Sequence, residues 1–213
     1  MTETEVPPPL YGVDIETDTA VDGLDPHVGR VLAVAVADDE GVEVVADHDE
    51  AALLRRLDAD LAERPAGVLV TWNGARFDLP YLASRAALLG VELGLALEVD
   101  LRRRDTRPPL PGHAGAYRAR WHDHAHLDVY RSYQADVGAV LGLPCTLKSV
   151  ARLVGLEPVE VDAARVHTLA APALGAYVAS DAACTRELAR RRWATAAPAV
   201  DLVADPPASR VLR

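Results

Sequence analysis

The order of apolar segments along the chain is the feature that most narrows its fold. Residues 31–37 form a continuous apolar run, VLAVAVA, as expected for a strand that is buried on both faces. Shorter apolar runs lie on either side of it, and the acidic turn at 38–41 indicates an antiparallel meander. Further apolar runs then alternate with segments of helical periodicity. The predicted strands are residues 11–15, 31–37, 42–46, 67–71 and 124–128.

Helices are predicted between and after these strands. Asp49 precedes leucines at helical spacing, so its side chain should cap a helix that ends near Ala62. The other predicted helices are residues 78–89, 129–140, 146–154 and 171–195. This order predicts an α/β fold with a mixed five-stranded sheet flanked by helices, which is the RNase-H-like architecture.

The domain boundaries follow from composition. Residues 1–9 are acidic and Pro-rich, which indicates a flexible leader, and residues 196–213 indicate a C-terminal tail. The single domain is therefore expected over 10–195. Within it, residues 98–122 are rich in Pro, Gly and Arg and predict an irregular surface insertion.

The net charge of −10 argues against a protein that coats nucleic acid by bulk charge. Arg is nevertheless concentrated at 101–120, and this segment either guides an anionic strand or forms a solvated loop. Cys145 and Cys184 lie in no zinc or disulfide pattern. The chain has neither a run of about 18–20 apolar residues nor a signal peptide, so no membrane association is expected and a cytoplasmic location is predicted.

Three short motifs carry the acidic residues of greatest interest. Asp14 and Glu16 lie two apart on a predicted strand and should point to the same face. Asp78 closes the motif NGARFD after a buried strand, where ligands of open sheets collect. Tyr177 and Asp181 are four apart on the last helix and share one face. Each motif alone is also compatible with exposed acids or helix caps, but oxygen ligands brought together would suit Mg²⁺ or Mn²⁺.

In their order and separation the three motifs resemble the DnaQ-like, DEDD-type 3′–5′ exonucleases. The matching pattern is D-I-E-T, then N-x-x-x-F-D, then Y-x-x-x-D, and Tyr177 points to the tyrosine (DEDDy) subclass. The segments 126–130 and 146–150 are similar to the exonuclease domains of family B DNA polymerases. The resemblance covers about residues 10–192, and with no polymerase domain in the sequence a free-standing exonuclease is expected.

The resemblance implies a metal-dependent 3′–5′ exonuclease that releases nucleoside 5′-monophosphates from single-stranded DNA. It implies two divalent cations, Mg²⁺ or Mn²⁺, one held by Asp14, Glu16 and Asp181. Asp14 would bridge to the second cation, with Asp78 acting through its water shell. Tyr177, whose ordinary pKa is near ~10, is a poor general base and is expected to hold the attacking water.

Substrate contacts are predicted for Asn73, Phe77 and Lys148, which match positions of the same resemblance. Phe77 is equally compatible with core packing, and Lys148 with an exposed surface position. His122, His124 and His126 alternate, which allows a zinc site, although adjacent alternating histidines are not typical of one.

Other functions remain open on the sequence alone. A 3′–5′ exoribonuclease would share the same carboxylates, and contacts to the 2′-hydroxyl would distinguish it. A catalytically silent nucleic-acid-binding domain or a small-nucleotide phosphodiesterase could use the same fold. A separate polymerase or repair protein is a candidate partner in addition to the nucleic acid.

Overall fold

The computed structural model describes residues 7–101 and 108–200 of the chain. The predicted leader and tail, and four of the arginines in the 101–120 segment, lie largely outside these residues. The strands of the described residues are β1 (Leu10–Thr17), β2 (Val31–Ala37), β3 (Val42–Val45), β4 (Val68–Thr71), β5 (Leu95–Val99), β6 (Tyr117–Trp121) and β7 (His124–Asp128). Helices are α1 (Glu50–Glu63), α2 (Asp78–Leu89), α3 (Tyr130–Tyr133), α4 (Leu147–Leu153) and α5 (Ala171–Ala196).

The strands form one mixed sheet in the order β3-β2-β1-β4-β7-β6-β5. β1, β2 and β3 make the predicted antiparallel meander, whereas β4 runs parallel to both β1 and β7. The carboxyl ends of β1, β4 and β7 therefore meet at one edge of the sheet. This α/β architecture agrees with the prediction, and residues of all three acidic motifs lie on elements that reach this edge.

The sheet has seven strands rather than the five predicted. Residues 98–122 are not wholly an irregular insertion, because they include the end of β5 and all of β6. The two strands pair in antiparallel register, and Arg118 lies opposite Glu98, forming a 2.6 Å ion pair. β5 and β6 are half-buried strands at the edge of the sheet and include charged residues. A prediction based on apolar runs therefore did not find this hairpin.

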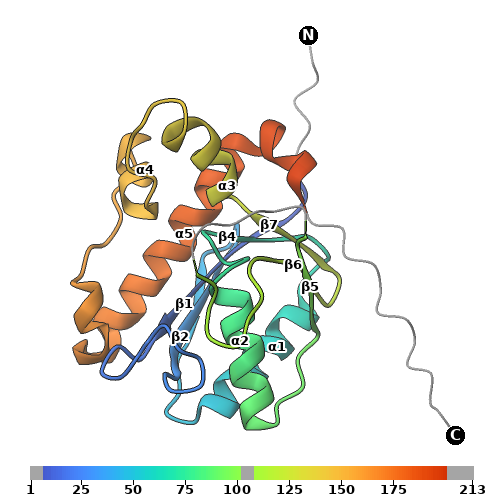
Figure 1. Cartoon of the computed structure of the whole chain (residues 1–213), viewed down its shortest axis with the longest axis vertical. Helices are drawn as coiled ribbons and strands as arrows, with labels where there is room; N and C mark the ends of the chain where they lie inside the picture. The colour runs from blue at the N-terminus through green and yellow to red at the C-terminus, as the bar shows by residue number, and fades with distance from the viewer. Residues whose placement is uncertain (1–6, 102–107, 201–213) are drawn as a thin grey trace, which may run out of the picture.

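Helices cover both faces of the sheet, with α1 and α2 on one side and α5 on the other (Figure 1). Asp49 caps α1 as predicted, since its side chain accepts a hydrogen bond from the Ala52 amide. The leucines of α1 at positions 53, 54, 57 and 61 are buried against β1 and β2. The predicted helix over 129–140 is instead α3 followed by a π-helical turn at Gln134–Gly138.

The long helix α5 crosses the other face of the sheet and contacts β1, β2 and β3 (Figure 1). Alanines of β2 at positions 33, 35 and 37 pack against Val178 and Ala182 of α5. Gly12 of β1 lies so close to the helix that a Cβ atom there would be 2.2 Å from the Ala182 carbonyl oxygen. Small side chains on the strands thus let α5 approach the sheet closely.

Candidate active site

Two acidic residues of β1 and one of α5 form the centre of the candidate site. Asp14 and Glu16 point to the same face of β1, as their spacing predicted. Asp181 reaches them from α5, and one carboxylate oxygen of each of the three lies within 4.8 Å of the other two. Among the described residues this is the group of acidic, histidine and cysteine side chains whose ligand atoms are close enough to hold one metal ion.

The three carboxylates repel one another in a partly buried setting. Burial, followed by the charges of Asp78, Asp181 and Glu16, raises the pKa of Asp14 well above its usual value. The same causes, burial first and then Asp181 and Asp78, raise the pKa of Glu16 to about 8. Burial also raises the pKa of Asp181, and a contact from Lys148 opposes that shift. The cluster is therefore short of positive charge, which bound protons or cations can supply.

Asp78 is the first residue of α2, which packs on the face of the sheet opposite α5 (Figure 1). β4 pairs with β1 only from Leu10 to Gly12, which leaves the later backbone of β1 open on that side. The backbone amide of Ile15 donates a hydrogen bond to the Asp78 carboxylate. Burial raises the pKa of Asp78 to about 7, and the charge of Asp128 adds to the shift. Asp78 thus lies beside the cluster, outside the three that could share one ion.

Lys148 is not an exposed surface residue. Thr146 caps α4 by accepting a hydrogen bond from the Ser149 amide, and this start of the helix directs Lys148 toward α5. Its ammonium group contacts the Asp181 carboxylate and lies 4.3 Å from the centre of the Tyr177 ring. Lys148 therefore brings the positive charge of the chain's single lysine to the acidic cluster.

Tyr177 lies one helical turn before Asp181, on the same face of α5. Burial, followed by the charges of Glu16, Asp181 and Asp14, raises the pKa of Tyr177 above its usual value. In this setting the phenol keeps its proton at neutral pH and can donate a hydrogen bond, which makes it a poor general base.

The turn between β4 and α2 carries the two remaining predicted contact residues. Asn73 is the second residue after β4 and has a positive φ of 68°, which is uncommon for a residue other than glycine. Phe77 ends the turn, and its ring lies 5.3 Å from the ring of Tyr81, packed in part against the core. The core-packing alternative for Phe77 thus has a structural basis, and its contact with substrate stays a prediction.

Asp128 ends β7 directly before the segment that forms α3, a position typical of a helix cap, but its partner lies elsewhere. Its carboxylate accepts a 2.8 Å hydrogen bond from the backbone amide of Asn73, and it makes no capping bond to α3. Asp128 is the last residue of β7 and lies in register with Thr71 at the end of β4. This register brings its carboxylate close to the Asn73 amide in the turn that follows β4. This contact between the end of β7 and the turn after β4 is not visible in local sequence.

The three alternating histidines do not form a zinc site. His122 lies in the turn before β7, with a positive φ of 48°, and its ring contacts Asp58 at 3.0 Å. His124 Nε2 is 2.7 Å from the Leu61 carbonyl oxygen, and His126 Nε2 is 2.9 Å from the Thr71 hydroxyl. Each ring thus contacts a different partner, and among the described residues the side chains close enough to share a metal ion include none of these histidines.

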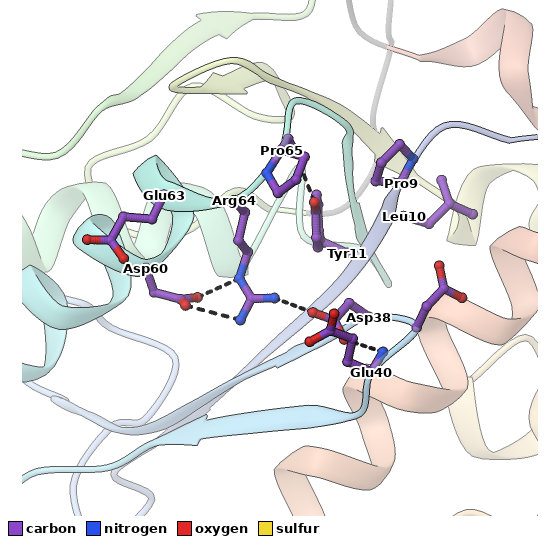
Figure 2. Close-up of a pocket in the computed structure, with 10 residues that line it drawn as sticks. Pro9, Leu10, Tyr11, Asp38, Glu40, Asp60, Glu63, Arg64 and Pro65 are labelled. Atoms are coloured by element: carbon purple, nitrogen blue, oxygen red, sulfur yellow. Dashed lines mark hydrogen bonds and ion pairs between the residues drawn. The ribbon is translucent and has the colours of Figure 1, made fainter.

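A separate hollow of about 320 Å³ lies toward the amino-terminal end of β1 (Figure 2). Arg64 crosses it, bonds to Asp60 at 2.7 Å and contacts Asp38, while the Tyr11 hydroxyl donates to the Pro65 carbonyl at 2.9 Å (Figure 2). These bonds join α1, β1 and the turn between β2 and β3. Its lining includes Leu10 and Tyr11, at the start of β1, whereas Glu16 lies near the end of that strand. The hollow is therefore separate from the candidate site.

Comparison with known proteins identifies the superfamily of the chain. The sequence model of the RNase H superfamily matches residues 12–169, and the chain belongs to that superfamily. Among the described residues, no helix is long and apolar enough to cross a membrane.

The relatives within this class include DNA polymerases. DNA polymerase 1 of Pyrococcus abyssi is 34% identical over 99 residues, which cover 40% of this chain and 12% of that protein. The DNA polymerase of Pyrococcus horikoshii is 35% identical over 97 residues, covering 39% and 8%. The structure of the family B DNA polymerase from Pyrobaculum calidifontis matches with a TM-score of 0.66 at 24% identity, over 88% of this chain and 25% of that one. The chain thus corresponds to a small part of each polymerase, and the predicted resemblance to family B polymerases is confirmed.

Proposed function

We propose that the chain is a metal-dependent 3′–5′ exonuclease that acts on single-stranded DNA and releases nucleoside 5′-monophosphates. The observation that carries the proposal is the meeting of Asp14, Glu16 and Asp181 within 4.8 Å, with raised pKa values. DNA is favoured over RNA because the matched relatives are DNA polymerases.

The donor set fits hard divalent cations. All of its ligands are carboxylate oxygens, which Mg²⁺ and Mn²⁺ prefer, and mutual repulsion favours the binding of positive charge. Asp14, Glu16 and Asp181 would hold one cation, and Asp14 and Asp78 would serve the second. A bound pair of this kind supplies charge stabilisation to the attacking and leaving oxygens of an in-line displacement at phosphorus.

The protein's own side chains would complete the chemistry. The Tyr177 hydroxyl, which keeps its proton, would donate a hydrogen bond to the attacking water or to a phosphate oxygen and so orient the reaction. Lys148 would offer its ammonium group to the scissile phosphate once cations replace it as the counter-charge of Asp181. Asn73 and Phe77 would contact the terminal nucleotide from the turn after β4.

The test is digestion of matched 5′-labelled single-stranded DNA and RNA oligonucleotides with Mg²⁺, Mn²⁺ or EDTA. The proposal expects a metal-dependent ladder that shortens from the 3′ end, with DNA cut faster than RNA. Asp14→Ala and Asp181→Ala should abolish it. Asp123→Ala, in the exposed turn before β7 at the opposite sheet edge, is the matched control and should cut normally. Full activity of Asp181→Ala would refute the assignment, and faster digestion of RNA would reassign the substrate.

A further inference from the structure

The turn that carries Asn73 has a backbone conformation that few residue types adopt, although asparagine tolerates it better than most. Asn73 adopts a left-handed backbone, and Gly74 follows with no room for a side chain, because a Cβ there would lie 2.4 Å from Thr71 atoms. A left-handed residue other than glycine persists when surrounding contacts fix it. Contacts from outside the turn therefore help to hold Asn73 in one conformation.

Asp128 supplies that restraint. It is 4% exposed, and one of its carboxylate oxygens accepts the 2.8 Å hydrogen bond from the Asn73 amide. The other lies 3.4 Å from Nε of Arg131, whose Nη1 is in turn 3.5 Å from the buried Asp100 carboxylate. The carboxylate is therefore fixed from both sides, and its charge is partly balanced by a guanidinium group.

The restrained turn leads directly to two predicted functional groups. The Asn73 carbonyl accepts hydrogen bonds from the amides of Arg76 and Phe77, at 3.0 and 3.2 Å, immediately before Asp78 begins α2. The side-chain oxygen of Asn73 is itself buried and has no hydrogen-bond partner among the described residues. A buried acceptor without a partner is costly, and a donor from a bound nucleotide would satisfy it.

We propose that Asp128 is a positioning residue for substrate: it fixes the backbone of Asn73 so that the side-chain amide meets the terminal nucleotide. This inference rests on the proposed exonuclease function. Asp128 does not touch the substrate, and it acts through the Asn73 amide across the junction of β4 and β7. Loss of the carboxylate releases the turn, and the Asn73 side chain then no longer has one fixed orientation toward the nucleotide.

The experiment compares kcat and KM on a 5′-labelled DNA strand for the wild type, Asp128→Ala, Asp128→Asn and the control Asp123→Ala. We expect Asp128→Ala to lower kcat/KM by about 10- to 100-fold, the loss typical of a misplaced contact group, and mainly through a raised KM. Asp128→Asn keeps an oxygen that can accept the Asn73 hydrogen bond, so it should recover most of this loss. Asp123→Ala should match the wild type.

A double-mutant cycle with Asn73→Gly distinguishes positioning from a general structural role. Glycine adopts the left-handed backbone freely and has no side chain to position, so Asp128→Ala should cost much less kcat/KM in that background. Equal losses in both backgrounds, or no loss in Asp128→Ala, would overturn the inference while leaving the exonuclease assignment intact. An inactive wild type would instead mark the failure of the proposed function, and the inference with it.

Discussion

In the absence of divalent cations, the free energy of unfolding should fall as the pH rises from about 5 to 8. Ionisation of Glu16 in the folded state should be a main cause. The pKa of Glu16 is raised from 4.5 to about 8 by burial and by the neighbouring carboxylates. Between these values the folded state holds a proton that the unfolded state has released. The stabilisation from this proton is therefore fully present below pH 4.5 and is lost as the pH rises through 8.

The size of the effect follows from the two pKa values. A carboxyl group with a pKa of 4.5 when unfolded and about 8 when folded costs the folded state up to about 5 kcal/mol once both forms are ionised. That is comparable with the whole stability of a typical domain, about 5–15 kcal/mol. Glu16→Gln removes the ionisable group and keeps the side-chain size, so it should stabilise the cation-free protein at pH 8 by a few kcal/mol.

The assay is urea unfolding in EDTA at pH values from 5 to 8.5, for the wild type, Glu16→Gln and Glu157→Gln. Glu157 is exposed and lies outside the cluster, so its variant should follow the wild type. Millimolar Mn²⁺ should restore wild-type stability at pH 8 and have less effect on Glu16→Gln. A free energy of unfolding that stays level from pH 5 to 8 in EDTA, or the same slope in Glu16→Gln, would refute the reasoning.

Three further predictions concern α5 and its contact with β1. Tyr177→Phe should bind divalent cations normally but cut DNA more slowly, by about 10-fold or more, as measured by single-turnover digestion, because it loses one orienting hydroxyl. Gly12→Ala should lower the free energy of unfolding by about 1–3 kcal/mol and also reduce cleavage, because its Cβ would meet the Ala182 carbonyl. Gly175 lies on the same helix, and a Cβ added there would meet only Val44 Cγ1, at 3.9 Å. Gly175→Ala should therefore raise the free energy of unfolding in urea by about 0.5–1 kcal/mol.

Sequence alone could predict the elements whose pattern is local and strong. β2 is an unbroken apolar run, α1 combines a cap with leucines at helical spacing, and α5 is long and periodic. The side-by-side placement of Asp14 and Glu16 needs only the two-residue repeat of a strand. These predictions agree with the structure because no distant contact was needed to make them.

The features missed from sequence depend on neighbours far along the chain. The strand β6 alternates arginine with tyrosine, alanine and tryptophan, so it shows no apolar run, and Arg118 forms an ion pair with Glu98 of β5. Asp128 satisfies the local rule for a helix cap, yet its hydrogen bond is to Asn73, 55 residues earlier. The position of Lys148 at the acidic cluster likewise depends on how α4 packs beside α5, which the local pattern does not contain.

The high alanine content of the chain has a structural consequence at the site. Asp181 can share a cation with Asp14 only if the axis of α5 lies close to the sheet, and the strand residues facing it are Gly12 and the alanines of β2. Larger side chains at these positions would hold the helix away from β1 and widen the 4.8 Å cluster. The metal-binding geometry proposed here therefore depends on residues that carry no functional group. Substitutions on this face should impair cleavage at smaller losses of stability than equally buried substitutions on the face covered by α1 and α2.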